Sequence, residues 1–197
     1  NYILCNGAAG FLDHEQVYKN LLDRDQLDAF VQEAHHEQID TAFVSLDNIK
    51  RSSSNDVTVM EEAMHSFGAV LPELDQFFAE EQEIYQALAF FDQTYDGTCS
   101  SYDKIRFVRW HENSVDVVPK NGSKAATILH LAEQVGIPHE DIISFGDGQN
   151  DREMLRMSGI GIAMGNAVPE VQAEAKMVTD TNDQDGIWKA LKELSVI

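Results

Sequence analysis

Apolar and polar residues alternate in regular blocks over the last third of the chain. Residues 123–135 place apolar side chains at helical spacing, with Ser123 as a candidate N-cap and Gly136 just past the end. Residues 142–145 and 160–164 are short apolar runs of the length of buried strands. Further elements are expected as helices over 150–157, 169–175 and 185–194 and as a strand over 177–179. Strands and helices that alternate in this way predict a parallel, doubly wound α/β sheet.

The middle of the chain has a different pattern. Residues 41–46, 84–91, 104–110 and 114–118 are apolar or alternating runs, the last three typical of antiparallel strands, and helices are predicted over 25–38, 59–67 and 74–78. This mixture predicts an α+β insertion with a core of its own. We therefore expect three parts, namely a core strand and entry segment over 1–17, an inserted α+β domain over 18–113, and a parallel α/β core over 114–197.

Composition excludes several classes of partner. The 197 residues carry 14 Lys and Arg against 34 Asp and Glu, a net charge of −20, which disfavours general nucleic-acid binding. No apolar run approaches the roughly 18 to 20 residues that cross a bilayer, so no membrane segment is expected. Cys5 and Cys99 are too few for a disulfide framework and are predicted to be free thiols in the cytoplasm. The chain begins in a strand-like run without Met, so we expect it to lack an N-terminal segment.

The run FGDGQND at 145–151 is the strongest candidate for chemistry. A buried strand leads into it and a helix follows, and ligands of parallel α/β folds bind at the carboxyl ends of strands. Asp147 and Asp151 are spaced to converge on one Mg²⁺ ion, and Asn150 with the N–H groups of the helix start could bind a phosphate oxygen. A solvated turn with an aspartate N-cap is the alternative. An EF-hand is excluded, because the sixth position from Asp147 is not glycine and the twelfth is not glutamate.

Longer motifs around this loop carry a family resemblance. The string GDGQNDREML, followed by GIGIAMGNAVPEVQAEAKMVTDTNDQDGI, resembles the fourth motif and the following segment of the haloacid dehalogenase superfamily, and most of all its Cof-type sugar-phosphate phosphatases. The string KNGSK at 120–124 resembles the third motif, whose lysine corresponds to Lys124. LCNGA at 4–8 more weakly resembles the core strand and turn before the family's cap. The resemblance implies an incomplete Rossmann-like core with an inserted cap domain over 18–113 that selects the substrate.

The resemblance also implies a function and roles for residues. It implies a Mg²⁺-dependent phosphatase for small phosphorylated metabolites such as sugar phosphates, which acts through an aspartyl-phosphate. Lys124, Asp147 and Asp151 would be catalytic, with Asp147 and Asp151 at the metal and Lys124 and Asn150 at the phosphate. The residues agree, because the Lys124 ammonium, one position after the N-cap Ser123, would neutralise a phosphate beside aspartates.

The family's nucleophile motif, DxDGT, is missing from the sequence. The only DGT lies at 96–98, where Thr94 stands in place of the first aspartate, and we interpret it as a turn. We therefore expect the 197-residue chain alone to be inactive. Two alternatives remain, a fragment of a P-type ATPase domain and a non-catalytic binding or regulatory module. A DxDGT string upstream of Asn1 would favour the enzyme over the module.

Polar residues elsewhere carry weaker signals. His35, His36, His111, His130 and His139 have no carboxylate or cysteine partner at metal-ligand spacing and are interpreted as surface or capping residues. Asn166, Asp183 and Asp185 are interpreted as turn and cap residues, with Asp183 the one that could support the site from outside.

Overall fold

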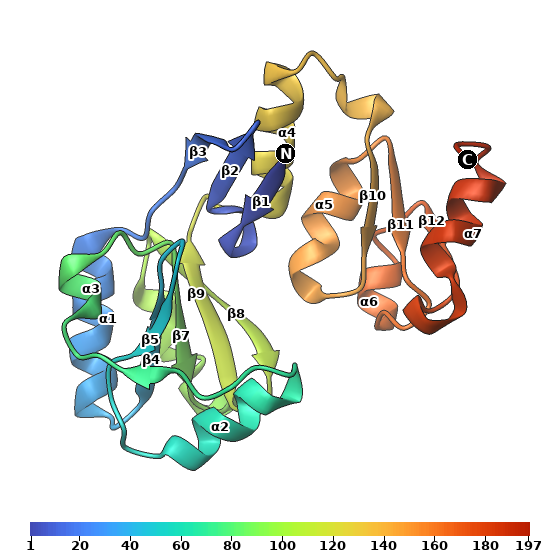
Figure 1. Cartoon of the computed structure of the whole chain (residues 1–197). Coiled ribbons are helices and arrows are strands. Elements are labelled where there is room, and N and C mark those ends of the chain that lie inside the picture. Colours follow the sequence, from blue (N-terminus) through green and yellow to red (C-terminus); the bar gives the residue numbers. More distant parts are fainter. The chain divides into compact units, whose positions relative to one another are not determined.

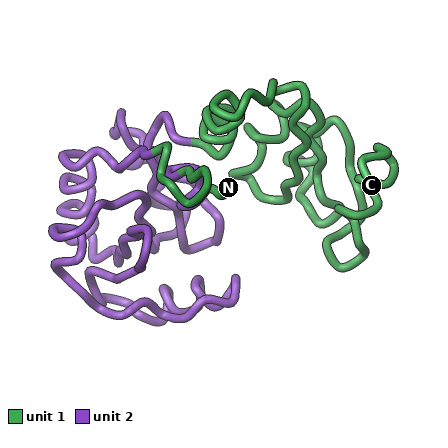
Figure 2. The backbone as a smooth tube through the Cα atoms, turned by 45° about the horizontal axis from the view of Figure 1, so that its top comes forward, with its two compact units in different colours: residues 1–3, 10–18, 123–197 green, residues 4–9, 19–122 purple.

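The computed structural model describes all 197 residues, and their contacts divide the chain into two compact units. Unit 1 contains residues 1–3, 10–18 and 123–197, and unit 2 contains residues 4–9 and 19–122 (Figure 2). No helix in either unit combines the length and the apolar character that crossing a bilayer requires.

A six-stranded sheet forms the centre of unit 2. Its strands follow the order β6-β5-β4-β7-β9-β8, and all neighbours are antiparallel except β5 and β6. The strands are β4 (Asp40–Val44), β5 (Ile49–Arg51), β6 (Glu73–Leu74), β7 (Gln86–Phe90), β8 (Ile105–His111) and β9 (Ser114–Pro119). The helices are α1 (Arg24–His36), α2 (Val57–Ser66) and α3 (Phe78–Glu81).

Helices cover both faces of this sheet (Figure 1). Ala87 and Ala89 of β7 belong to one core cluster with Phe30 of α1, whereas Leu88 of β7 belongs to another with Met60 of α2. Successive side chains of a strand point to opposite faces, so β7 needs apolar residues at nearly every position. That requirement explains why residues 84–91 form one almost continuous apolar run.

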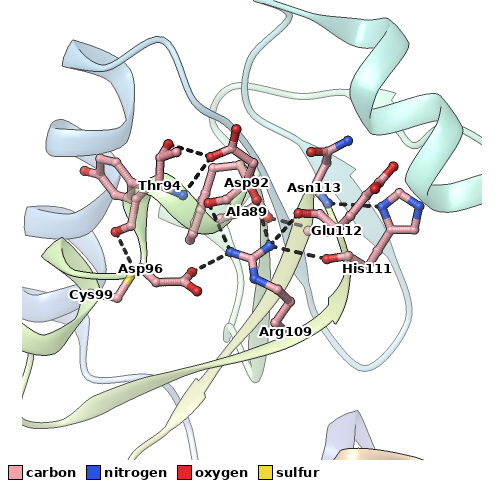
Figure 3. A network of polar contacts seen from close by, with 12 residues as sticks. Ala89, Asp92, Thr94, Asp96, Cys99, Arg109, His111, Glu112 and Asn113 are labelled. Carbon is pink, nitrogen blue, oxygen red and sulfur yellow. Dashed lines mark hydrogen bonds and ion pairs between the residues drawn. The ribbon is translucent and has the colours of Figure 1, made fainter.

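Arg109 of β8 connects the loops at one end of this sheet through hydrogen bonds (Figure 3). Its Nη1 donates to the carbonyl oxygens of Phe91 at 2.9 Å and Glu112 at 3.0 Å. Its Nη2 donates to the carbonyl oxygen of Asp92 at 3.2 Å and to Oδ1 of Asp96 at 2.5 Å. One guanidinium thus joins the segment after β7 to the turn between β8 and β9, which is a use suited to its several fixed donors.

Unit 1 contains the parallel sheet that the last third of the chain predicts. Its strands lie in the order β10-β11-β12, paired in parallel, with Ile143 opposite Ile160 and Ile162 opposite Met177. The strands are β10 (Ile143–Gly146), β11 (Ile160–Ala163) and β12 (Met177–Val178). The helices are α4 (Lys124–Gln134), α5 (Arg152–Met157), α6 (Pro169–Gln172) and α7 (Gly186–Glu193).

The N-terminal residues form a small sheet that the sequence patterns did not predict in full. It has the order β1-β2-β3, with β1 (Tyr2–Leu4), β2 (Ala9–Leu12) and β3 (Glu15–Lys19). Between β1 and β2, a 3₁₀ turn over Cys5–Gly7 contains the Asn and Gly of the NGA string, and Cys5, Asn6 and Gly7 all have positive φ. Asn and Gly tolerate this left-handed backbone better than most residues, which fits their place in the motif.

The predicted α/β class is confirmed, while two details differ from the sequence patterns. Residues 114–119 form β9 and pair with β7 and β8, so the contacts divide the chain between Gly122 and Ser123 rather than at 114. Residues 74–78 are not one helix, because Leu74 pairs with Arg51 in β5 and the helix begins only at Phe78. Asp96 and Gly97 lie in a turn between two 3₁₀ helices, as expected for this DGT string.

Gly161 of β11 should not accept a side chain. A Cβ at this position would lie 1.9 Å from the carbonyl oxygen of Leu155. Relieving this clash would require moving backbone atoms of α5, which is energetically costly. We expect Gly161→Ala to lower the free energy of unfolding by about 3 kcal/mol, measured by urea denaturation. Gly97→Ala is the control, because no atom lies within 4 Å of its added Cβ. Equal stability of the two variants would contradict this packing.

Candidate functional site

The acidic loop begins where β10 ends. Gly146 is the last residue of the strand, and Asp147 follows it into a 3₁₀ turn over Gln149–Asp151 and then α5. A Cβ on Gly146 would lie 2.5 Å from Cβ of Asp151. Glycine at this position therefore lets the Asp151 side chain pack directly against the end of the strand.

Asp151 is the buried centre of the loop. It is 6% exposed, and its Oδ2 accepts hydrogen bonds from the backbone N–H groups of Asp147 at 3.1 Å and Gly148 at 3.0 Å. Its Oδ1 accepts a hydrogen bond from Nζ of Lys124 at 2.7 Å. Both carboxylate oxygens are thus occupied by donors of the protein, which is the condition for keeping a buried charge stable.

Lys124 reaches Asp151 from the first turn of α4. The helix starts at Lys124 because Oγ of Ser123 accepts a hydrogen bond from the N–H group of Ala126 at 3.1 Å. The prediction of Ser123 as the N-cap is thus confirmed. The Lys124 side chain is 30% exposed and the Asp151 side chain 9%. The Lys124 side chain is therefore partly open to solvent while its ammonium contacts Asp151.

Asp147 and Asn166 form the exposed part of the site. Nδ2 of Asn166 donates a hydrogen bond to Oδ2 of Asp147 at 2.8 Å. Both residues are exposed, and they follow the ends of the paired strands β10 and β11. Our interpretation of Asn166 as only a turn residue missed this contact. The available signal was its position three residues after β11, at the same edge of the sheet where Asp147 follows β10.

Asn150 lies on the same loop as Asp147. It is exposed, and its Oδ1 is 2.7 Å from the position that a Cβ on Gly148 would take, so glycine leaves room for the carboxamide. Asp183 is bonded within its own turn, where its Oδ1 accepts a hydrogen bond from Oγ1 of Thr181. The chain holds no group of three or more acidic, histidine or cysteine side chains arranged around a metal site.

Two arginines connect α5 to the segment after α6. Nη2 of Arg152 donates to Glu174 at 2.7 Å, and Nε of Arg156 donates to the same carboxylate at 2.9 Å. The hydrogen bonds from Arg152 and then Arg156 lower the pKa of Glu174. The carboxylate therefore stays ionised at neutral pH and joins α5 to the segment that follows α6.

The site thus combines one cation with two carboxylates that differ in environment. Asp151 is buried and accepts hydrogen bonds from Lys124 and the loop amides. Asp147 is exposed and accepts a hydrogen bond from a side chain on one oxygen. Such a set can offer a carboxylate oxygen to a hard cation and an ammonium to an anionic group.

Comparison with known proteins identifies the family. The model of the haloacid dehalogenase-like hydrolases matches residues 1–191. The putative phosphatase YkrA of Bacillus subtilis is 34% identical over 197 residues, which cover 100% of this chain and 76% of YkrA.

Solved structures agree with this assignment. The phosphatase BT1666 of Bacteroides thetaiotaomicron, of the same superfamily, has a TM-score of 0.88 and 28% identity, covering 98% of this chain and 72% of BT1666. The subclass IIB sugar phosphatase BT4131 has a TM-score of 0.84 and 30% identity, covering 98% of this chain and 74% of BT4131. The motifs GDGQND and KNGSK thus belong to a known catalytic fold, and the chain is a member of the haloacid dehalogenase-like hydrolases, within their Cof-type phosphatases.

Proposed function

We propose that the chain forms the metal- and phosphate-binding part of a Mg²⁺-dependent phosphomonoester hydrolase in the cytoplasm. Its substrates are small phosphorylated metabolites, and the sugar phosphatase BT4131, 30% identical, supports sugar phosphates among them. The observation that carries the proposal is the contact of Lys124 with Asp151 at 2.7 Å, next to the exposed Asp147. This arrangement supplies a fixed cation and a carboxylate ligand at one place.

The donor set of the loop fits Mg²⁺. This ion prefers oxygen ligands and takes one or two carboxylates together with waters and substrate phosphate. Asp147 would hold it, and Asp151 would support the site from the interior, because its oxygens already accept hydrogen bonds from Lys124 and the loop amides. When bound, the ion would offset the negative charge of the phosphoryl oxygens.

The residues of the chain have distinct tasks in this reaction. Lys124 binds a phosphate oxygen and neutralises its charge, while Asp151 orients the Lys124 ammonium. Asn150 donates a hydrogen bond to the phosphate from the exposed side of the loop. Phosphoryl transfer depends mainly on positioning and charge neutralisation, so these groups act without being nucleophiles.

The nucleophile in this proposal is an aspartate outside the 197 residues. The phosphoryl group passes from the substrate oxygen to that carboxylate and the substrate leaves as its alcohol; water then hydrolyses the aspartyl-phosphate to inorganic phosphate and the free aspartate. Two facts support the proposal, the absence of a DxDGT string from the sequence and the greater length of the relatives, of which the chain covers 76% in YkrA. We assign selection of the substrate to a cap formed by the α+β part of the chain, predicted at 18–113.

The test compares a longer form of the protein, with its nucleophile segment, and the 197-residue chain. The longer form should release phosphate from a panel of sugar phosphates only with Mg²⁺, and Asp147→Asn should abolish this activity. The 197-residue chain should be inactive. In Mg²⁺-soaked crystals of the longer form, an oxygen of Asp147 should lie about 2.0–2.1 Å from the ion. Phosphate release that continues after a chelator has removed Mg²⁺ would refute the proposal. An ion bound only by residues 18–113 would refute it as well.

A further inference from the structure

We propose that Asn166 is a positioning residue that aims the carboxylate of Asp147 at the metal. The inference rests on the proposed function, in which Asp147 is a metal ligand. Its basis is the hydrogen bond from Nδ2 of Asn166 to Oδ2 of Asp147, 2.8 Å long. With Oδ2 held in this way, rotation of the carboxylate is restricted and Oδ1 is left for the metal.

The backbone before Asn166 is hydrogen-bonded to the end of β10 and to the segment that follows β12. Met164 N–H donates to the carbonyl oxygen of Gly146 at 3.0 Å, next to Asp147. Gly165 N–H donates to the carbonyl oxygen of Asp180 at 3.1 Å on the other side. A Cβ on Gly165 would lie 2.9 Å from backbone atoms of residues 179–181, so this turn packs closely. Asn166 is therefore presented from a fixed segment of backbone.

The orientation of the Asn166 carboxamide is also determined. The backbone N–H of Asn182 points at Oδ1 of Asn166, with 3.4 Å between nitrogen and oxygen. A backbone N–H only donates, so it requires the carboxamide oxygen on its side and places the NH₂ group toward Asp147. The geometry thus makes Asn166 a donor to Asp147 before any ligand arrives.

Asp147 needs such a partner more than Asp151 does. Asp151 is 6% exposed and accepts three hydrogen bonds, so its conformation is fixed by the loop itself. Asp147 is exposed, and an exposed side chain loses rotamer freedom when it binds an ion. Partners that orient a metal ligand change metal affinity or activity by about 10- to 100-fold when they are removed.

The experiment measures metal dependence in the longer form of the protein. We expect Asn166→Ala to raise the Mg²⁺ concentration for half-maximal activity by about 10-fold or more. At saturating Mg²⁺ the KM for a sugar phosphate should stay near that of the wild type. Independently of activity, the Kd for Mn²⁺, measured by electron paramagnetic resonance, should rise by a similar factor. Gln149→Ala is the matched control, because it removes an exposed carboxamide from the loop that carries Asp147.

The outcomes separate this inference from the proposed function. If Asp147→Asn abolishes Mg²⁺-dependent turnover while Asn166→Ala leaves both metal constants unchanged, the positioning role is wrong and the function stands. If Asn166→Ala lowers only the thermal stability, its role is structural and the inference is also wrong. If wild-type turnover does not depend on Mg²⁺, the proposed function and the inference fall together.

Discussion

Lys124→Ala is expected to lower kcat/KM of the longer form of the protein by about a hundredfold or more. In a chain of net charge −20, a phosphate dianion next to Asp147 and Asp151 needs a fixed cation close by. Two unit charges 4 Å apart interact by about 4 kcal/mol at an effective dielectric constant of about 20. Since about 1.4 kcal/mol corresponds to a tenfold change in rate, losing even part of this interaction reaches the expected factor.

The same substitution should have only a moderate effect on stability. Alanine is a good residue for the first turn of α4, so the helix itself should persist. The cost comes from Asp151, which loses the partner on Oδ1 but keeps the amides of Asp147 and Gly148 on Oδ2. Because the Lys124 side chain is 30% exposed, water can replace part of the contact, and we expect a loss of about 1–2 kcal/mol.

Lys120→Ala is the matched control for this prediction. Lys120 is exposed and lies four positions earlier in the chain, outside α4. Its removal changes the net charge of the protein by the same amount, so it measures the effect of overall charge without the effect of the site. Similar kinetic losses in the two variants would show that Lys124 acts only through net charge.

Much of unit 1 could be predicted from the sequence because its signals are local. The runs 142–145 and 160–164 are buried strands between helices, and short connections leave parallel pairing as the simplest arrangement. The candidate loop was equally accessible, because Asp147 and Asp151 lie in one turn of sequence. The direct contact of Lys124 with Asp151 was not predicted, because the sequence indicated only that Lys124 opens the helix that precedes β10.

The details that the sequence did not predict depend on contacts between distant segments. Whether residues 114–119 belong to the parallel core or to the six-stranded sheet depends on pairing with β7 and β8, and an apolar strand suits either. Leu74 lies in a strand because it pairs with Arg51, a residue 23 positions earlier in the chain. Asn166 was missed for the same reason, since its partner Asp147 is 19 residues distant and turn propensity alone explained its position.

Asp151→Ala is expected to cause the largest combined loss, in both stability and activity. The buried carboxylate accepts hydrogen bonds from three donors, the Lys124 ammonium and the N–H groups of Asp147 and Gly148. Without it the two amides lose their acceptor and the ammonium loses its orientation. We expect about 3 kcal/mol less stability by urea denaturation and at least a hundredfold lower kcat/KM. Asp141→Ala, at an exposed aspartate of the same unit, should change stability by no more than about 0.5 kcal/mol.

Asp151→Asn separates the two tasks of this carboxylate. An asparagine can turn its oxygen toward the amides of Asp147 and Gly148, which keeps the loop closed, but its NH₂ group then faces the Lys124 ammonium, and two donors cannot pair. Stability should therefore recover in part relative to Asp151→Ala, while activity stays low. In a double-mutant cycle, Lys124→Ala combined with Asp151→Ala should cost less than the sum of the single losses, by about 1–2 kcal/mol in stability. Additive losses would mean that the Lys124 contact with Asp151 carries no energy of its own.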